Sequence, residues 1–363
     1  MKSKVYFTAV DNSDNVRLIS AKLKSLLDES GLLGFIKKDE RVAVKMHFGE
    51  EDNTGFVPAQ YLGIICEGII KQPGRQAKPF LIDTNTLYRG KRMNSRQHIR
   101  LAYSHGFTKD KTGVEVIIPE DSQNTSEVAI NAKLIKTAKI STPFLAADAI
   151  LGVAHFKGHL MAGFGGALKN LGMGCATREG KLAQHSDLSP FVIIQNCAGC
   201  GACLKACPAG AVSIQNKKAR IDSARCIGCA ACVAVCPNNA IDVNWDAGGD
   251  TIQEKMVEYA SAVLKDKKGR AAFINFALKI TAECDCLAKD DPRIAPDIGI
   301  FASTDPVSID KACLDLINNA CGRDVFKEAH PKRDGLKQLQ YASALGLGSL
   351  EYELIRAIHK KPL

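Results

Sequence analysis

Two runs of cysteine constrain this chain more than any other feature of its sequence. Each run has the spacing C-x-x-C-x-x-C-x-x-x-C followed by proline, and the second run begins 29 residues after the first. Structural zinc is bound by pairs of cysteines, whereas in this spacing three cysteines hold one 4Fe–4S cluster and the fourth reaches a second cluster. We therefore expect two 4Fe–4S clusters. The first would be held by Cys197, Cys200, Cys203 and Cys236, and the second by Cys226, Cys229, Cys232 and Cys207.

The cysteine runs define a small module at residues 191–246. Their spacing is that of bacterial-type ferredoxins. Gly199, Gly201 and Gly228 lie between the ligands, where glycine permits a positive φ and a close approach of the backbone to a cluster. A strand-like segment follows each run. We predict an α+β, ferredoxin-like module that transfers single electrons.

Strand-like and helical segments alternate on both sides of this module. Several of the strand-like segments are nearly continuous apolar runs, which is typical of strands that are buried on both faces of a parallel sheet. We expect strands at 41–48, 79–83, 114–119, 148–156, 270–278 and 297–303. We expect helices at 16–30, 58–72, 306–321 and 333–346. The predicted fold is an α/β body with a mostly parallel sheet, formed by 1–190 plus 247–363, with the ferredoxin-like module inserted at 191–246.

A glycine-rich stretch at 155–181 begins where one of the expected strands ends, the usual place of ligand sites in open α/β sheets. Its seven glycines fit neither a dinucleotide-binding fingerprint nor a P-loop. Backbone N–H groups without side-chain obstruction can still bind an anion. We expect Gly163, Gly165 and Gly166 to contact such a cofactor or substrate.

Histidines and lysines at this strand end and at a second one are candidates for catalysis. The candidates are Lys45, His47, His155, Lys157, His159 and Lys169. Histidine near its ordinary pKa transfers protons, and lysine supplies positive charge to an anion. His155 and His159 are alternatively a metal-binding pair, or two surface or hydrogen-bonded histidines.

Further candidates follow other strands. Asp83 is a turn-former or part of the same crevice, with the basic residues Arg89, Lys91 and Arg92 just beyond it. Cys175, Cys284 and Cys286 are buried, inert thiols or a third metal or redox-active site. Cys66, Cys313 and Cys321 fit the cores of amphipathic helices, and Asp305 fits a helix cap.

The composition indicates which kinds of partner the protein binds. The net charge is +9, but the lysines and arginines are scattered, aromatic residues make up only 6%, and no nucleic-acid motif is present. An anionic small molecule or an acidic protein partner, such as an external electron carrier, explains the charge better. No apolar run is long enough to span a membrane and the N-terminus does not resemble a signal peptide, so we expect a cytoplasmic protein.

Several segments together resemble the family known as domain of unknown function 362, in its branch with an inserted two-cluster ferredoxin domain. They are KMHFGE (45–50), DTNTLYRG (83–90), HGF (105–107), HFKGH (155–159), GFGGALKNLGMGC (163–175), CDC (284–286) and IFASTDPVSID (300–310). The resemblance implies a bacterial or archaeal iron–sulfur protein, and it implies no particular reaction.

We therefore expect an iron–sulfur oxidoreductase. It would relay single electrons through its two clusters to an anionic substrate or cofactor held in the glycine-rich crevice. The alternative is a non-enzymatic electron carrier or redox-sensing module that docks a protein partner. A third hypothesis, a regulator that binds nucleic acid, is supported by the net charge alone. The sequence leaves the substrate, the direction of electron flow and the oligomeric state open.

Overall fold

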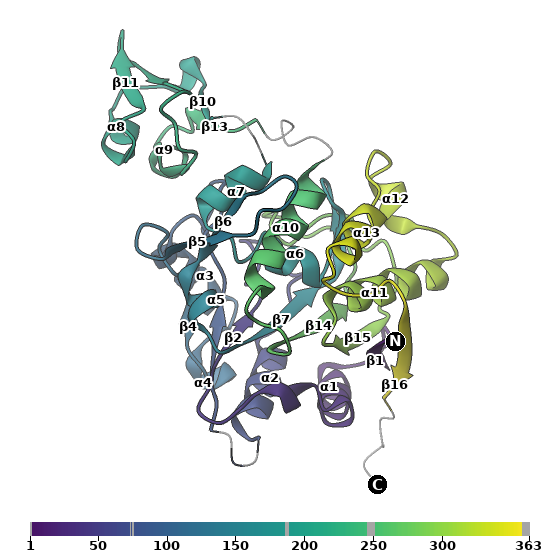
Figure 1. The fold of residues 1–363 in the computed structure, drawn as a ribbon. Helices are drawn as coiled ribbons and strands as arrows, with labels where there is room; N and C mark the ends of the chain where they lie inside the picture. Colours follow the sequence, from purple (N-terminus) through teal and green to yellow (C-terminus); the bar gives the residue numbers. More distant parts are fainter. Residues whose placement is uncertain (1, 73, 75, 186–188, 245–250, 358–363) are drawn as a thin grey trace.

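The computed structural model describes residues 2–72, 74, 76–185, 189–244 and 251–357, and an eight-stranded sheet lies at its centre (Figure 1). The strand order is β16-β1-β15-β14-β7-β2-β3-β4. The strands are β1 (Ser3–Ala9), β2 (Arg41–Lys45), β3 (Lys78–Ile82), β4 (Val116–Ile117), β7 (Ala149–His155), β14 (Ala271–Ala277), β15 (Gly299–Ser303) and β16 (Tyr352–Arg356). Strand β15 runs antiparallel to both of its neighbours, and the other pairs are parallel. The body therefore has the α/β fold with a mostly parallel sheet.

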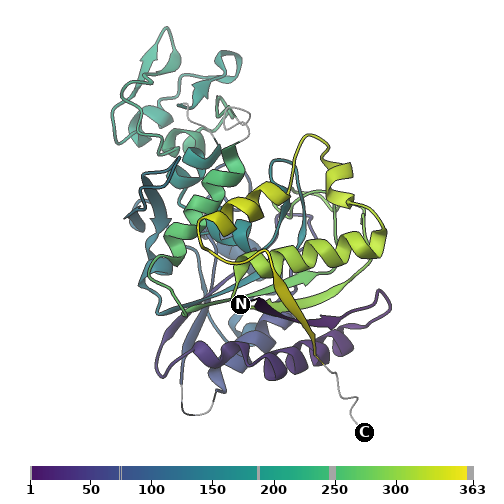
Figure 2. The ribbon, with the colours of Figure 1, turned by 45° about the vertical axis from the view of Figure 1, so that its right-hand side comes forward.

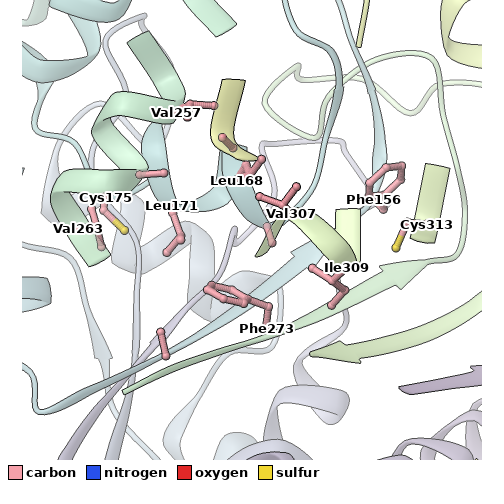
Figure 3. Packing of buried hydrophobic residues seen from close by; sticks show 14 of the residues in the cluster. Phe156, Leu168, Leu171, Cys175, Val257, Val263, Phe273, Val307, Ile309 and Cys313 are labelled. Atoms are coloured by element: carbon pink, nitrogen blue, oxygen red, sulfur yellow. The ribbon is translucent and has the colours of Figure 1, made fainter. Parts of the chain in front are cut away.

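Helices cover both faces of the sheet (Figure 2). One face packs against α1 (Val16–Ser30), the short helix η1 (Leu32–Phe35) and α2 (Ala59–Ile70). The other face packs against α6 (Ala167–Gly172), α10 (Ile252–Leu264), α11 (Pro306–Cys321) and α13 (Leu336–Ala344). Figure 3 shows Leu168 and Leu171 of α6 between the side chains of α10 and Phe273 of the sheet. The result is three layers around two apolar cores.

Strand register explains why both cores form. In β14, Ala272 and Ile274 belong to the core beneath α1 and α2, whereas Ala271 and Phe273 belong to the core beneath α6 and α11. Successive side chains of a strand point to opposite faces, so a strand covered on both faces needs apolar residues at nearly every position. All seven residues of β14 are buried, as this requirement predicts.

The remaining elements of the body connect these layers. They are α3 (Ser95–Ser104), α4 (Lys109–Thr112), β5 (Thr125–Ala129), β6 (Thr137–Ser141), α5 (Thr142–Ala146), β8 (Lys157–His159), β9 (Gly163–Gly165), α7 (Arg178–His185) and α12 (Val325–Ala329). Strands β5 and β6 form one antiparallel hairpin and β8 and β9 form another. The second hairpin carries the start of the glycine-rich stretch over the ends of the central strands.

Residues 191–244 form a separate small unit that projects from the body beyond α7 (Figure 1). Its elements are β10 (Phe191–Val192), η2 (Ile194–Asn196), α8 (Ala202–Ala206), β11 (Val212–Gln215), β12 (Lys218–Ile221), α9 (Ala231–Val235) and β13 (Ile241–Asp242). β10 pairs with β13, and β11 pairs with β12. The unit has a core of its own, built largely from cysteine, valine and isoleucine. The expected module boundary at 246 lies outside the described residues.

Most of the strands and helices that the sequence predicts for the body lie at the expected positions. Each of the six expected strands coincides with a strand of the central sheet, and the helices expected at 16–30 and 306–321 have those bounds. The Asn15 side chain caps α1, and Asp305 caps α11 with two backbone hydrogen bonds, as expected for a capping residue before proline. Among the described residues, no helix has the length and apolar character needed to cross a membrane.

Candidate functional site

A crevice of about 510 Å³ opens at the carboxyl ends of the parallel strands β2, β3 and β7. Its walls include all six residues expected to take part in catalysis: Lys45, His47, His155, Lys157, His159 and Lys169. Gly165 and Gly166 line it too, whereas Gly163 is not among the lining residues. Asp83 and the Cys284–Cys286 segment complete the wall. Strand ends far apart in the sequence thus meet at one edge of the sheet.

Asp83 anchors one side of the crevice. Its carboxylate is 2% exposed and lies 3.1 Å from Lys45 Nζ, 3.3 Å from Arg92 Nη2 and 3.7 Å from His98 Nε2. Burial opposes ionisation of this carboxyl, but Lys45 and Arg92 outweigh that effect and lower its pKa to about 2. Asp83 is therefore a permanent anion that holds two cations at the crevice edge.

His47 lies beside the same arginine. Its Nε2 is 2.5 Å from Arg92 Nη1, and its Nδ1 accepts a hydrogen bond from the backbone N–H of Gly49. Burial and then the charge of Arg92 hold the pKa of His47 well below its usual range. The ring is therefore neutral at neutral pH.

His155 and Lys157 converge on Asp285 at the opposite wall. His155 Nδ1 is 2.9 Å from Asp285 Oδ1, and Lys157 Nζ is 3.3 Å from Asp285 Oδ2. His155 Nε2 lies 2.8 Å from the carbonyl of Leu278. Burial opposes the charge of Asp285, but His155 and Lys157 keep its pKa well below the ordinary value. Both histidine nitrogens have structural partners, so this trio holds the 284–286 segment in place.

Lys169, His159 and two cysteines form the centre of the crevice. Lys169 Nζ lies 3.3 Å from Cys284 Sγ. The candidate metal-ligand atoms of His159, Cys284 and Cys286 all lie within 4.8 Å of one another. Burial and then Lys169 hold the pKa of His159 well below its usual range. Burial alone would lower the pKa of Lys169, but Cys284, Cys286 and Asp285 together outweigh burial and the net shift is upward.

The glycines of 155–181 allow close packing with neighbouring elements. A Cβ on Gly166 would lie 2.2 Å from Asp310 Oδ1, and one on Gly158 would lie 2.1 Å from the carbonyl oxygen of Ala282. The first N–H groups of α6, on Ala167 and Leu168, donate to the buried Asp310 carboxylate at 2.7 and 3.0 Å. The anion at the start of α6 is thus a side chain of the protein itself.

Several lining residues were not singled out in the sequence as parts of this site. They include Thr86, Leu87, Tyr88, Met161, Met173, Lys181, His185, Glu283 and Leu287. Lys181 Nζ donates to Thr84 Oγ1 and to the carbonyls of Asn85 and Ala176. Burial lowers the pKa of Lys181 to about 7, although the charges of Asp83 and Asp121 oppose this shift. Lys181 is the last residue of the glycine-rich stretch at 155–181, which is the sequence signal that could have indicated it.

The eight cysteines of the small unit line two further cavities. One cavity is bordered by Cys197, Cys200, Cys203 and Cys236, and the other by Cys207, Cys226, Cys229 and Cys232. Backbone N–H groups of Ala219, Ala211 and Ala240 donate to the sulfurs of Cys197, Cys207 and Cys236 at 3.2 to 3.3 Å. Gly199 and Gly228 have φ values of 66° and 71°, so both adopt the left-handed conformation that glycine favours.

The small unit and the crevice share two segments of the body. Leu87 and Leu182 pack into the core of the small unit, and Arg89 Nη1 donates to the carbonyl of Pro237 at 3.3 Å. Leu87 also lines the crevice, as does Lys181, the neighbour of Leu182 on α7. The 84–90 loop and α7 thus separate the cysteine-lined cavities from the crevice.

Comparison with known proteins gives one clear match. The family model described as a domain of unknown function, DUF362, matches residues 42–315. No curated protein matches. The lactate racemase apoprotein from Thermoanaerobacterium thermosaccharolyticum has 13% identity and a TM-score of 0.41, over 77% of this chain and 51% of that one. A Thermotoga maritima protein solved by a structural genomics consortium has 14% identity and a TM-score of 0.40, over 85% of this chain and 59% of that one. The chain thus spans between half and three-fifths of these proteins, and similarity at this level says nothing of a shared activity.

Proposed function

Since the chain belongs to the DUF362 family, whose description records no activity, we propose a function from its own residues: an iron–sulfur oxidoreductase that acts on an anionic substrate or cofactor in the crevice. The observation that carries the proposal is the grouping of the cysteines. The eight sulfurs divide between two cavities in the crossed sets that a two-cluster ferredoxin requires.

The residues around these cavities fit 4Fe–4S clusters. Each cavity offers four thiols, and the backbone N–H groups that already point at Cys197, Cys207 and Cys236 would stabilise thiolate charge. Cys197, Cys200, Cys203 and Cys236 would hold one cluster, and Cys226, Cys229, Cys232 and Cys207 the other. When bound, such clusters accept and donate single electrons. The small unit is accordingly the proposed ferredoxin-like module, inserted between 1–190 and 247–363.

Charge in the crevice supports an anionic substrate. Lys45 and Arg92 share one carboxylate, that of Asp83, and Lys157 shares that of Asp285 with His155. With Lys169, Lys181 and Glu283, which also line the crevice, five lysine and arginine side chains face three carboxylates, and burial strengthens their effect on a bound anion. Lys169 lies between these two clusters of charge and is less constrained, because its ammonium faces Cys284 rather than a carboxylate.

The neutral histidines would then take part in proton transfer. The pKa values of His47 and His159 lie well below the usual range, so both rings are neutral. Because His159 Nδ1 accepts two backbone hydrogen bonds, the proton on its other ring nitrogen would be available to a substrate. The walls that surround them limit the access of water, which strengthens every electrostatic interaction with the substrate. An external electron carrier or redox protein would exchange electrons at the small unit.

The test compares Lys169→Ala with Lys109→Ala, an exposed lysine outside the crevice. Both variants are purified without oxygen, and electron paramagnetic resonance checks that their clusters are intact. Reduced protein is then mixed with a panel of anionic acceptors and the rate of cluster reoxidation is measured. Loss of one charged hydrogen bond costs about 1.5–3 kcal/mol, so the Lys169 variant should be slower by about tenfold or more at low acceptor concentration.

The alternative is an electron carrier or redox-sensing module, through which electrons would pass without using the crevice. Under that alternative the Lys169 variant should match the parent protein and the Lys109 variant for every acceptor. Equal rates in all three proteins would therefore refute the enzymatic role of the crevice. Absence of iron and sulfide from protein purified without oxygen would refute both functions.

A further inference from the structure

The Cys284–Asp285–Cys286 segment is held in an unusual position for a loop. Asp285 is 1% exposed and is bound by His155 and Lys157, both of which come from the end of β7 and the start of β8. The backbone N–H of Leu287 donates to the carbonyl of Cys284, which closes a turn around the segment. Because Asp285 points into the protein, both flanking cysteines line the crevice, with their sulfurs within 4.8 Å of each other.

The two thiols have different surroundings. Cys284 is 3% exposed, and Lys169 Nζ lies 3.3 Å from its sulfur. The Cys286 thiol donates to Cys284 and, together with Lys169, holds the pKa of Cys284 well below its ordinary value. The same hydrogen bond and burial raise the pKa of Cys286 well above its ordinary value. One thiolate nucleophile beside one protonated thiol is the arrangement that dithiol oxidoreductases use.

The geometry is less suited to a metal ion. His159 would be the third ligand, but its Nδ1 already accepts hydrogen bonds from the backbone N–H groups of Met161 and Ala162, at 3.2 and 3.1 Å. A neutral imidazole has one lone pair of this kind, so the other ring nitrogen carries the proton. A cation between the thiols would also be repelled by the ammonium of Lys169, which lies against Cys284. Thiolate charge is favoured at this position, and added positive charge is not.

We infer that Cys284 and Cys286 are a redox-active pair that cycles between dithiol and disulfide, and that its substrate is a small organic disulfide carrying an anionic group. The inference rests on the proposed function, which supplies a one-electron donor of the iron–sulfur class. Two such electrons and one proton break the Cys284–Cys286 bond, leaving a thiolate on Cys284 beside Lys169 and a thiol on Cys286.

The oxidative half of the cycle consumes the substrate. The Cys284 thiolate attacks one sulfur of the substrate disulfide, forms a mixed disulfide and releases the first product thiolate. Cys286 then loses its proton to the solvent or to a neighbouring base and attacks the Cys284 sulfur. The Cys284–Cys286 bond forms again and the second product thiolate leaves. The net change is one substrate disulfide reduced to two thiolates by two electrons.

The test measures the oxidation state of Cys284 and Cys286 directly. Trypsin releases the peptide 280–289, which contains Cys284 and Cys286 and no other cysteine. Reduced, cluster-loaded full-length protein is exposed without oxygen to dithiodipropionate, which is dianionic, or to hydroxyethyl disulfide, which is neutral and similar in size. The protein is then denatured in iodoacetamide and digested, and the masses of the peptides are measured by mass spectrometry. The peptide should change from doubly alkylated to an unalkylated form two hydrogens lighter, about tenfold faster with the dianion because of the charge of the crevice.

Two variants test the separate roles of Cys284 and Cys286, and a second peptide serves as an internal control. Cys286→Ala should trap a mixed disulfide on Cys284, whereas Cys284→Ala should trap none. The peptide 170–178 carries only Cys175, which is fully buried, and it should remain singly alkylated throughout. Reduced methyl viologen, a one-electron donor, should return the oxidised 280–289 peptide to its doubly alkylated form.

Several outcomes would overturn the inference. They are a 280–289 peptide that stays doubly alkylated, a disulfide that methyl viologen does not reduce although the clusters are reduced, and a stoichiometric metal ion that the parent retains and both cysteine variants lose. The iron content of the same samples separates this inference from the proposed function. Protein with intact clusters and an inert 280–289 peptide retains the proposed function and loses only the dithiol.

Discussion

Replacing Asp83 with asparagine should destabilise the body strongly, because it removes the single carboxylate between two buried cations. Lys45 and Asp83 are 1% and 2% exposed, and Arg92 is 5% exposed. Asparagine has nearly the same shape as aspartate, so the change removes charge with little loss of packing. Lys45 would keep its bonds to the carbonyl of Met46 and to Asn170, but neither partner carries a compensating charge.

The magnitude follows from the pKa of Asp83. A fall from 3.8 to about 2 corresponds to about 2.4 kcal/mol of stability at neutral pH. Leaving two buried cations without a partner costs more than losing the pair, so the expected loss is about 3–5 kcal/mol. The folded-state pKa is depressed, so the contribution of Asp83 is complete above about pH 4 and disappears as the pH falls towards 2. The difference between parent and variant should shrink over that interval.

Urea unfolding, followed by circular dichroism without oxygen, measures this loss. Glu115→Gln is the matched control, because Glu115 pairs with Lys109 at 3.1 Å but both side chains are about 70% exposed. Exposed pairs of this kind contribute less than about 1 kcal/mol. If Asp83→Asn lies within about 1 kcal/mol of the parent protein at pH 7, the argument that Asp83 neutralises the crevice wall is wrong.

Two further predictions concern packing and cofactor content. Gly166→Ala should cost about 1–3 kcal/mol in the same urea assay, because its Cβ would lie 2.2 Å from Asp310 Oδ1, whereas Gly34→Ala, with open space around its Cβ, should change stability by less than about 0.5 kcal/mol. Protein purified without oxygen should contain about eight iron atoms and eight sulfides per chain, and Cys207→Ala should damage the cluster of Cys226, Cys229 and Cys232 more than the other. Iron analysis and electron paramagnetic resonance measure this, and selective loss of the cluster of Cys197, Cys200 and Cys203 would contradict the crossed assignment.

The elements of the body could be predicted because their information is local. Strands β7 and β14 are buried along their whole length, so they are continuous apolar runs in the sequence. Helix α1 begins after a capping asparagine and ends at Gly31, which has a φ of 57°. The sheet order and the antiparallel strand β15 were not predicted, because pairing between strands far apart in the chain depends on contacts that no local pattern records.

The crevice could be predicted only in outline. Strand ends with polar side chains indicated its edge, since carboxyl ends of parallel strands meet there. Its chemistry depends on partners that are distant in the chain: Lys169 and Cys284 are 115 residues apart, and His155 and Asp285 are 130 apart. The glycines illustrate the same limit on predicting the crevice from the sequence. The sequence reveals that a Cβ is missing at Gly166, but the neighbour that requires this, Asp310, lies in α11.

These distant contacts give the crevice one consistent electrostatic character. Two buried carboxylates at the crevice wall, Asp83 and Asp285, each bind cations and have depressed pKa values, so neither is available to accept a proton from a substrate. Another buried carboxylate, Asp310, has a pKa that burial raises to about 6, but it is occupied by the N–H groups of α6. Glu283 also lines the crevice. Under the proposed function, lysine and arginine would bind the substrate, and these buried cations would stabilise the negative charge that the substrate gains with each electron.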